Sequence, residues 1–95
     1  RTEISQGHGM LFRFQPAKRK RFWMRNMLFP VDMVFISNNR VISIEENVPV
    51  CKSFPCLEYG PDSEIEGLIE IAAGEVERLS IKVGDFVYIQ SLYQH

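Results

Sequence analysis

Apolar and polar side chains alternate with a period of two along most of this chain, and this pattern predicts β-strands rather than helices. Residues 31–36 depart from the alternation because they are nearly all apolar, with Asp32 as the exception. Such a run is typical of a strand that is buried on both faces near the middle of a sheet. The strands predicted in this way are residues 10–14, 22–25, 31–36, 41–44, 65–71 and 86–90.

The connections between these segments contain residues that favour turns. A turn at 15–17, which includes a proline, predicts that the first two strands form a hairpin. Asn38 and Asn39 predict a tight turn between the next two strands, because asparagine tolerates a positive φ. Residues 46–63 contain three prolines and a glycine without periodicity, so we expect a long surface loop there. Residues 73–79 are the one good helix candidate.

Six short strands and one short helix predict a mostly β fold, a small antiparallel barrel or sandwich. The chain has 95 residues, and we expect a single domain over residues 1–95. No apolar stretch approaches the roughly 18 residues that would predict a transmembrane helix. The chain begins with Arg1 rather than Met, which indicates processing or truncation and leaves room for an upstream targeting segment.

Charge is distributed unevenly between the two halves of the sequence. Residues 1–40 contain eight Arg and Lys against two acids, a net charge of +6, whereas residues 41–95 contain three against ten, a net charge of −7. One interpretation is that basic and acidic strands lie side by side in one sheet. The other is a dipolar molecule with a basic face for an anionic partner. The basic run at 18–21 is expected at a solvated hairpin tip, so nucleic acid is not a predicted partner.

Motifs over nearly the whole chain resemble those of the domain of unknown function 192 family. The resemblance implies a mostly β fold and an exported or membrane-anchored context, and it implies no activity. The chain departs from the family pattern in lacking an N-terminal strand and a Gly-Leu-Met segment, which predicts an open sheet edge. The resemblance rests on GMLF at 9–12, FWMRN at 22–26, PVDMVFI at 30–36, VPVC at 48–51, PCLEY at 55–59, LIEIAAG at 68–74 and IKVGD at 81–85.

Cys51 and Cys56 are separated by four residues. In the exported context that the resemblance implies, two cysteines this close predict a disulfide that holds the long loop in one shape. Free thiols and redox or metal chemistry are the alternatives, although redox motifs use the spacing Cys-x-x-Cys. His8 and His95 lie near opposite ends of the chain and match no ligand motif, so we predict neither a metal site nor a cofactor.

The most distinctive cluster of residues surrounds Trp23. In a functional interpretation, Trp23 is a flat binding platform flanked by Arg25 and Asn26, because aromatic rings beside amide and guanidinium donors suit sugars and other polar ligands. In a structural interpretation, Phe22 and Met24 face the core while Trp23 covers the other face of the sheet. The platform requires a partly exposed indole that lines a concavity.

Two acids, Asp32 and Glu70, occur inside apolar strands. A buried carboxylate must be hydrogen-bonded or paired with a cation. Structural pairing is one interpretation. In the other, both acids face one cleft and act as an acid–base pair, as in glycoside hydrolysis. Carboxylates on opposite faces of a sheet would exclude that hydrolase.

The leading hypothesis is a non-catalytic module in an extracytoplasmic compartment, whether periplasmic, secreted or membrane-anchored. It would bind a sugar, another polar ligand or a protein through Trp23, Arg25, Asn26 and Tyr59, next to the disulfide-braced loop. The alternative is a small hydrolase that uses Asp32 and Glu70, so enzymatic activity stays undecided at this stage. A third hypothesis is a homo-oligomer formed through the open sheet edge.

Overall fold

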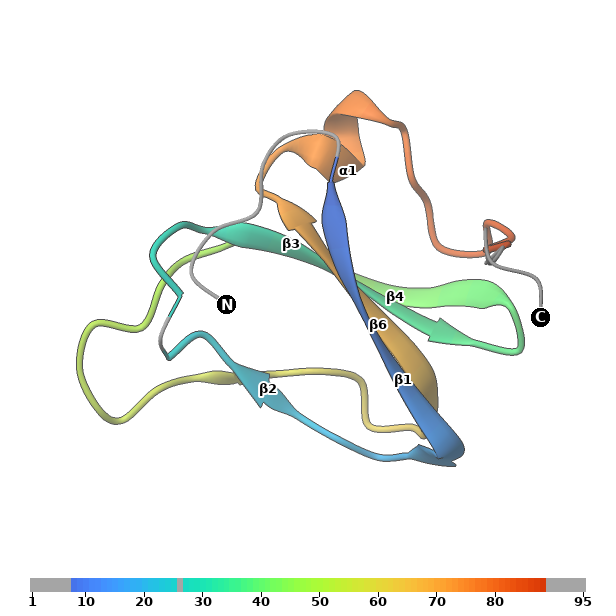
Figure 1. The fold of residues 1–95 in the computed structure, drawn as a ribbon, viewed down its shortest axis with the longest axis horizontal. Coiled ribbons are helices and arrows are strands. Elements are labelled where there is room, and N and C mark those ends of the chain that lie inside the picture. Colours follow the sequence, from blue (N-terminus) through green and yellow to red (C-terminus); the bar gives the residue numbers. More distant parts are fainter. Residues whose placement is uncertain (1–7, 26, 89–95) are drawn as a thin grey trace, which may run out of the picture.

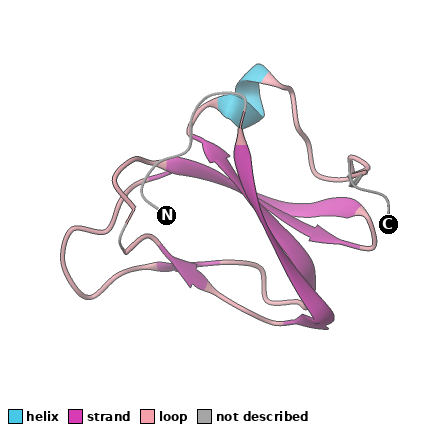
Figure 2. Cartoon of the chain, in the orientation of Figure 1, coloured by secondary structure: helices cyan, strands magenta, loops and turns pink. Residues whose placement is uncertain are grey.

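The computed structural model describes residues 8–25 and 27–88, which form six strands and one short helix (Figures 1 and 2). The predicted mostly β fold is confirmed. The elements in chain order are β1 (Gly9–Lys18), β2 (Phe22–Trp23), β3 (Val31–Ser37), β4 (Arg40–Val48), β5 (Glu58–Tyr59), β6 (Ile65–Ala72) and α1 (Glu75–Arg78).

Four strands form an antiparallel sheet in the order β1-β6-β3-β4. The strand β3 lies in the middle of this sheet, and its residues 31–36 are all buried. The predicted central strand is therefore confirmed. Both faces of β3 are covered by other parts of the chain, so its outward positions are apolar as well, apart from Asp32.

The two faces of the sheet carry separate apolar clusters, because successive side chains of a strand point to opposite faces. We call them the Met33 face and the Val34 face, after two neighbouring residues of β3. The cluster on the Met33 face consists of Met24, Met27, Val31, Met33, Phe35, Val48, Ile65 and Leu68, with Phe12, Phe14, Phe22 and Tyr59 packed against them. The cluster on the Val34 face consists of Val34, Ile36, Val41, Ile71 and Val76, with Ile44, Ile69, Ile81 and Val87 packed against them.

A second sheet of two short strands, β2 and β5, packs against the Met33 face. Phe22 pairs with Tyr59, and its ring lies 6.1 Å from that of Phe35 and 5.9 Å from that of Phe14. The predicted hairpin of the first two strands is wrong, because β1 pairs with β6 and β2 pairs with β5. The predicted turn at 15–17 is wrong too: β1 continues to Lys18 through a register shift, the kind of irregularity that tolerates a proline in an edge strand.

The Val34 face is covered by α1 and by the chain that follows it. The helix is shorter than the predicted 73–79, since Gly74 adopts φ 94° and the helical turn begins only at Glu75. The predicted strand at 86–90 is wrong in its described part, where Phe86 forms only an isolated bridge with Arg40. Residues 89 and 90 lie outside the described residues.

The architecture is a sandwich-like fold rather than a closed barrel. Asn38 and Asn39 adopt φ of 52° and 60°, so the tight turn predicted between β3 and β4 is confirmed. In the part of the chain that the structure describes, β1 lies at one edge of the larger sheet and β4 at the other. The amide of Val41 at the start of β4 donates to the carbonyl oxygen of Asp85 at 2.9 Å, so the later chain covers that end of the β4 edge.

Candidate functional site

A group of three side chains lies where β2 meets the disulfide loop, two of them exposed and the third half-buried, and we call it the Trp23 cluster. Trp23 is 46% exposed, and its ring centroid lies 5.6 Å from that of Phe54 at an interplanar angle of 54°. The guanidinium carbon of Arg25 lies 4.1 Å from the centroid of the Phe54 ring. Aromatic pairs at such a distance and a cation over a ring face are both favourable contacts. The Trp23 cluster is therefore Trp23, Phe54 and Arg25.

Strand alternation explains why Trp23 is exposed. Phe22 points into the Met33 face, so the next side chain in β2 points outward, and Met24 is again buried. The structural interpretation is correct for Phe22 and Met24. The structure also meets one requirement of the binding platform, because the indole of Trp23 is partly exposed.

The disulfide predicted between Cys51 and Cys56 is present, with a Cα–Cα distance of 5.7 Å. The closed loop carries Phe54 at its outer side, where the ring is 60% exposed. The amide of Cys51 donates to the carbonyl oxygen of Met24 at 3.3 Å, which ties the base of the loop to the chain just after β2. Two local constraints thus hold Phe54 beside Trp23.

A hollow of about 220 Å³ lies on the inner side of the disulfide loop, and Tyr59 is part of its wall. It adjoins the Trp23 cluster through Met24 and the loop, but its walls do not include Trp23. The structure thus brings three of the four predicted binding residues into one region, Trp23, Arg25 and Tyr59. Asn26 lies outside the described residues. The residues around this hollow are Met24, Pro49, Val50, Cys51, Lys52, Ser53, Pro55, Leu57 and Tyr59.

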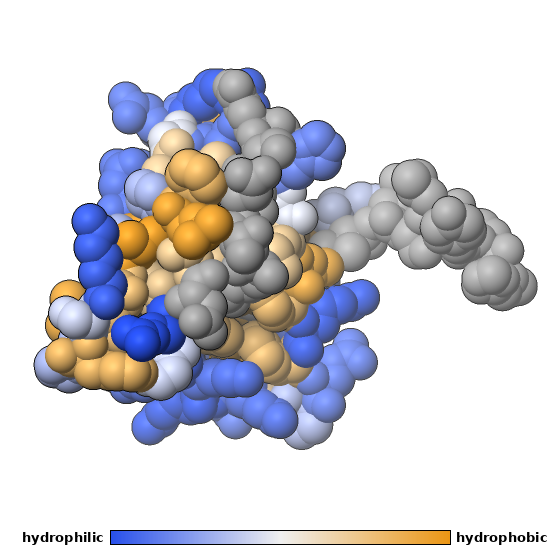
Figure 3. All heavy atoms as spheres, turned by 60° about the vertical axis from the view of Figure 1, so that its left-hand side comes forward, coloured by the Kyte–Doolittle hydropathy of each residue, from blue (hydrophilic) through white to orange (hydrophobic). Residues whose placement is uncertain are grey.

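Other large apolar side chains are exposed in the segment between β2 and β3 and just after the disulfide loop. Leu28 is 66% exposed, Phe29 is 51% exposed and Leu57 is 74% exposed. Figure 3 turns this side of the molecule forward and shows orange apolar patches broken by blue hydrophilic side chains.

The structure does not bring the carboxylates of Asp32 and Glu70 together. Asp32 pairs with Ile71 on the Val34 face, whereas Glu70 pairs with Met33 on the Met33 face. Both side chains are fully buried, and the sheet itself separates them. The predicted acid–base pair is therefore wrong for these two residues, because one residue of register decides which face a strand side chain occupies.

Asp32 has a structural role instead. Its carboxylate accepts hydrogen bonds from the amides of Asn47 at 2.8 Å, Gly74 at 3.1 Å and Val76 at 2.9 Å. These bonds join β3 to the end of β4 and to the first turn of α1. The structural interpretation of the buried acid is thus correct, with backbone amides as its partners.

Half of the basic run at 18–21 is used within the molecule. Arg21 donates to the carbonyl oxygens of Gly60 at 2.9 Å and Glu58 at 3.0 Å, and its guanidinium lies 3.5 Å from Asp62. The ammonium of Lys20 lies 5.2 Å from the centroid of the Phe14 ring. Arg21 of the basic first half thus contacts Asp62 of the acidic second half.

Two further features concern metals and membranes. Among the described residues, no three His, Cys, Asp or Glu side chains gather closely enough to hold a metal ion. Over the same ranges, the structure has no helix with the length and apolar character needed to cross a bilayer.

The sequence model of domain of unknown function 192 (DUF192), described as "Uncharacterized ACR", matches residues 1–89. The chain belongs to the DUF192 family. The resemblance in the sequence motifs is thereby confirmed. No curated protein sequence matches this DUF192 domain.

Two solved structures are similar to this DUF192 domain. A protein of unknown function from Novosphingobium aromaticivorans shares 32% sequence identity at a TM-score of 0.79, over 90% of this chain and 60% of its own. A protein from Sinorhizobium meliloti, named as a candidate transcription regulator, shares 32% identity at a TM-score of 0.76, over 90% of this chain and 65% of its own. The DUF192 domain described here thus spans less than two thirds of either chain.

One member of the Trp23 cluster was missed in the sequence. Phe54 lies between Cys51 and Cys56, in a segment that was expected only to be a surface loop. A large aromatic residue inside a six-residue disulfide ring has little room to bury itself, and that signal could have identified it. Its contact with Trp23 depends on the pairing of β2 with β5, which the sequence did not predict.

Proposed function

We propose that this DUF192 domain is a non-catalytic binding module of an extracytoplasmic protein and that the Trp23 cluster binds a protein partner. The observation that carries the proposal is an exposed Trp–Phe–Arg contact held in place by a disulfide. Trp and Arg are enriched among the residues that dominate binding energy at protein interfaces. A loop that is already ordered before binding loses little conformational entropy when the partner docks.

The chemistry of the cluster favours a protein over a sugar. Sugar platforms need a free ring face with polar groups around it, whereas Arg25 lies over the Phe54 ring and Trp23 is tilted against it. The exposed residue Leu57, just after the disulfide loop, is aliphatic. Such a surface suits an apolar anchor on the partner, with acidic groups at the rim facing Arg25.

The contacts of the basic run argue in the same direction. The Sinorhizobium relative is named for transcription regulation, which would call for cations free to reach phosphates. In this chain Arg21 binds carbonyl oxygens and Lys20 lies over aromatic rings. The disulfide supports an oxidising compartment, because disulfides persist outside the reducing cytosol.

The experiment uses photo-crosslinking, followed by binding measurements on the purified pair. A photoreactive residue is placed at Leu57, next to the cluster, and in a second variant at Tyr88, which is 86% exposed elsewhere. We expect a protein that crosslinks at Leu57 and not at Tyr88. Titration calorimetry with that protein should then show binding about 30-fold weaker for Phe54→Ala, which corresponds to about 2 kcal/mol.

The chain offers a matched control for the Phe54 substitution. Phe86 is 74% exposed and lies under Arg40, with 3.9 Å between the guanidinium carbon and the ring centroid, so it repeats the Arg–Phe contact outside the cluster. Phe86→Ala should leave the affinity unchanged. Equal affinity of Phe54→Ala and the unmodified domain would contradict the proposal, and so would saturable binding of neutral oligosaccharides that Trp23→Ala abolishes.

A further inference from the structure

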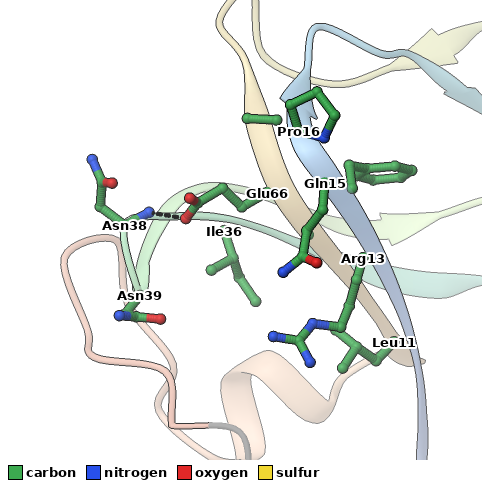
Figure 4. A pocket seen from close by; sticks show the side chains of 11 residues that line it. Leu11, Arg13, Gln15, Pro16, Ile36, Asn38, Asn39 and Glu66 are labelled. Atoms are coloured by element: carbon green, nitrogen blue, oxygen red, sulfur yellow. Dashed lines mark hydrogen bonds between the residues drawn. The ribbon is translucent and has the colours of Figure 1, made fainter.

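A second hollow, of about 320 Å³, lies on the other side of the larger sheet from the Trp23 cluster. It is on the Val34 face, at the end of β1 and β6 that is remote from α1 (Figures 1 and 4). Its size falls at the lower end of the range for small-molecule sites, about 300–1,000 Å³. The residues around it are Leu11, Arg13, Phe14, Gln15, Pro16, Ala17, Ile36, Asn38, Asn39, Glu66 and Gly67.

A glycine occupies the floor of the hollow. Gly67 of β6 pairs with Arg13 of β1 on one side and with Ile36 of β3 on the other, so the three residues lie side by side across adjacent strands. With no side chain at Gly67, a gap stays open between Arg13 and Ile36, about 10 Å from strand to strand. The backbone of Gly67 is outside the left-handed region, so its φ does not demand a glycine. A Cβ at Gly67 would lie 3.2 Å from the carbonyl oxygen of Phe12, so the close approach of the β1 backbone also favours glycine here. A glycine inside a strand often marks the close approach of a ligand or of another backbone.

Opposite charges lie on two sides of this gap. Figure 4 shows Arg13 and Gln15 extending from β1 toward Ile36 and Asn39. Glu66 lies across the hollow, where its carboxylate accepts a hydrogen bond from the amide of Asn38 at 2.5 Å. A carboxylate offers about four lone-pair positions, so this bond leaves room for a ligand donor. Arg13 and Glu66 are the charged side chains around this hollow.

The remaining walls are amide and aliphatic. Gln15, Asn38 and Asn39 carry primary amides, each of which can donate and accept hydrogen bonds. Leu11 is 40% exposed and Ile36 is 5% exposed, and they give the hollow an apolar side. A peptide-like ligand matches this combination, since it joins an ammonium, a carboxylate, amide groups and an apolar side chain in one small molecule.

We infer that this hollow is a binding site for a small zwitterion, an α-amino acid or a dipeptide. The ligand carboxylate pairs with Arg13, the ammonium pairs with Glu66, and an apolar side chain lies against Leu11 and Ile36. The site is separate from the Trp23 cluster and does not depend on the function proposed for it.

The test uses L-leucine and glycyl-leucine as probes, in a titration followed by the backbone amide signals of the intact domain. We expect saturable shifts at Gly67, Asn38 and Asn39. Each charge of the probe should matter separately, so N-acetyl-leucine and leucinamide should each bind about tenfold weaker than leucine. A tighter complex with glycyl-leucine would identify a peptide ligand, and a tighter complex with leucine would identify a free amino acid; both support the inference.

Variants of the two charged residues assign the roles. Arg13→Gln should make leucine and leucinamide bind equally, while Arg13→Lys should keep most of the difference. Glu66→Gln keeps an oxygen for the Asn38 amide but removes the charge, so it should make leucine and N-acetyl-leucine bind equally. Gly67→Ala should weaken the binding of both probes, because it places a methyl group on the floor of the hollow. Phe54→Ala should leave the binding of both probes at this site unchanged.

Three results would overturn the inference. The first is the absence of saturable shifts with either probe at concentrations of tens of millimolar. The second is equal binding of the free and capped probes to the unmodified domain. The third is a set of shifts around Trp23 rather than Gly67. Circular dichroism on each variant shows that it is folded, and binding of the protein partner to Arg13→Gln tests the Trp23 cluster independently.

Discussion

Asp32 shows how a single residue can connect three elements of this fold. Its carboxylate is fully buried, and three backbone amides donate hydrogen bonds to it. Two of those amides belong to Gly74 and Val76, around the start of α1. A helix of one turn has little stability of its own, so the carboxylate that binds its first amides helps to keep it docked.

We expect Asp32→Asn to lower the free energy of unfolding by about 2–4 kcal/mol, because the amide has one acceptor oxygen for three donors and leaves buried N–H groups unpaired. Urea unfolding followed by circular dichroism measures the change. Asp85→Asn is the control, since the exposed carboxylate of Asp85 accepts a hydrogen bond from the backbone amide of Lys82 at 2.8 Å. The free energy of unfolding should fall by less than about 1 kcal/mol in this variant. A change in Asp32→Asn no larger than in the control would contradict this role.

At the scale of elements, the disulfide loop and β2 form one unit although neither is large. β2 has two residues and pairs only with β5, so it contributes few backbone hydrogen bonds. The loop adds the contact of Phe54 with Trp23 and the bond from Cys51 to Met24. We therefore expect the order of the Trp23 cluster to depend on the covalent closure of the loop.

Replacing Cys51 and Cys56 together by Ala should lower the free energy of unfolding by about 2 kcal/mol, the chain-entropy estimate for so short a loop. The double variant should also bind the protein partner more weakly, with a larger loss of affinity than for a probe in the hollow around Gly67. Denaturation measures the stability and calorimetry the affinity. Mass spectrometry of the unmodified domain before and after reduction should show the gain of the two hydrogens that reduction of the disulfide adds. An unchanged partner affinity in the double variant would show that the bond does not organise the cluster.

At the scale of the whole molecule, the arrangement of the described strands places opposite charges next to each other and leaves β1 at an edge of the larger sheet. β1 carries Arg13 and Lys18 and pairs with β6, which carries Glu66. Within the described residues, the other side of β1 pairs with no strand. Pro16 lacks an amide hydrogen, so the part of β1 suited to pairing with another chain is its N-terminal half.

The homo-oligomer stays a prediction, which this edge makes specific. We expect two copies to pair along the N-terminal half of β1, because an open edge presents unpaired amide and carbonyl groups to a second strand. Light scattering should then give twice the mass of 11.1 kDa, falling toward the single mass on dilution. A constant mass of one chain at all concentrations would contradict the pairing.

The local pattern of side chains was enough to predict the strand content, the buried position of β3 and the turn at Asn38 and Asn39. The bond between Cys51 and Cys56 was predicted from their short separation together with the exported context that the family resemblance implies. Each of these depends on residues that are close together in the chain, where periodicity, backbone preference and loop length act directly. The exposure of Trp23 follows from the same alternation once Phe22 is known to be buried.

Pairing between strands far apart in the chain could not be inferred in this way. It placed Asp32 and Glu70 on opposite faces, brought Phe54 to Trp23, and left Gly67 between Arg13 and Ile36 as the floor of a hollow. Alternation tells which side chains share a face of one strand, but not which strand lies next to it or in which register. Those choices follow from how all the apolar faces can be buried at once, and that is a property of the folded chain as a whole.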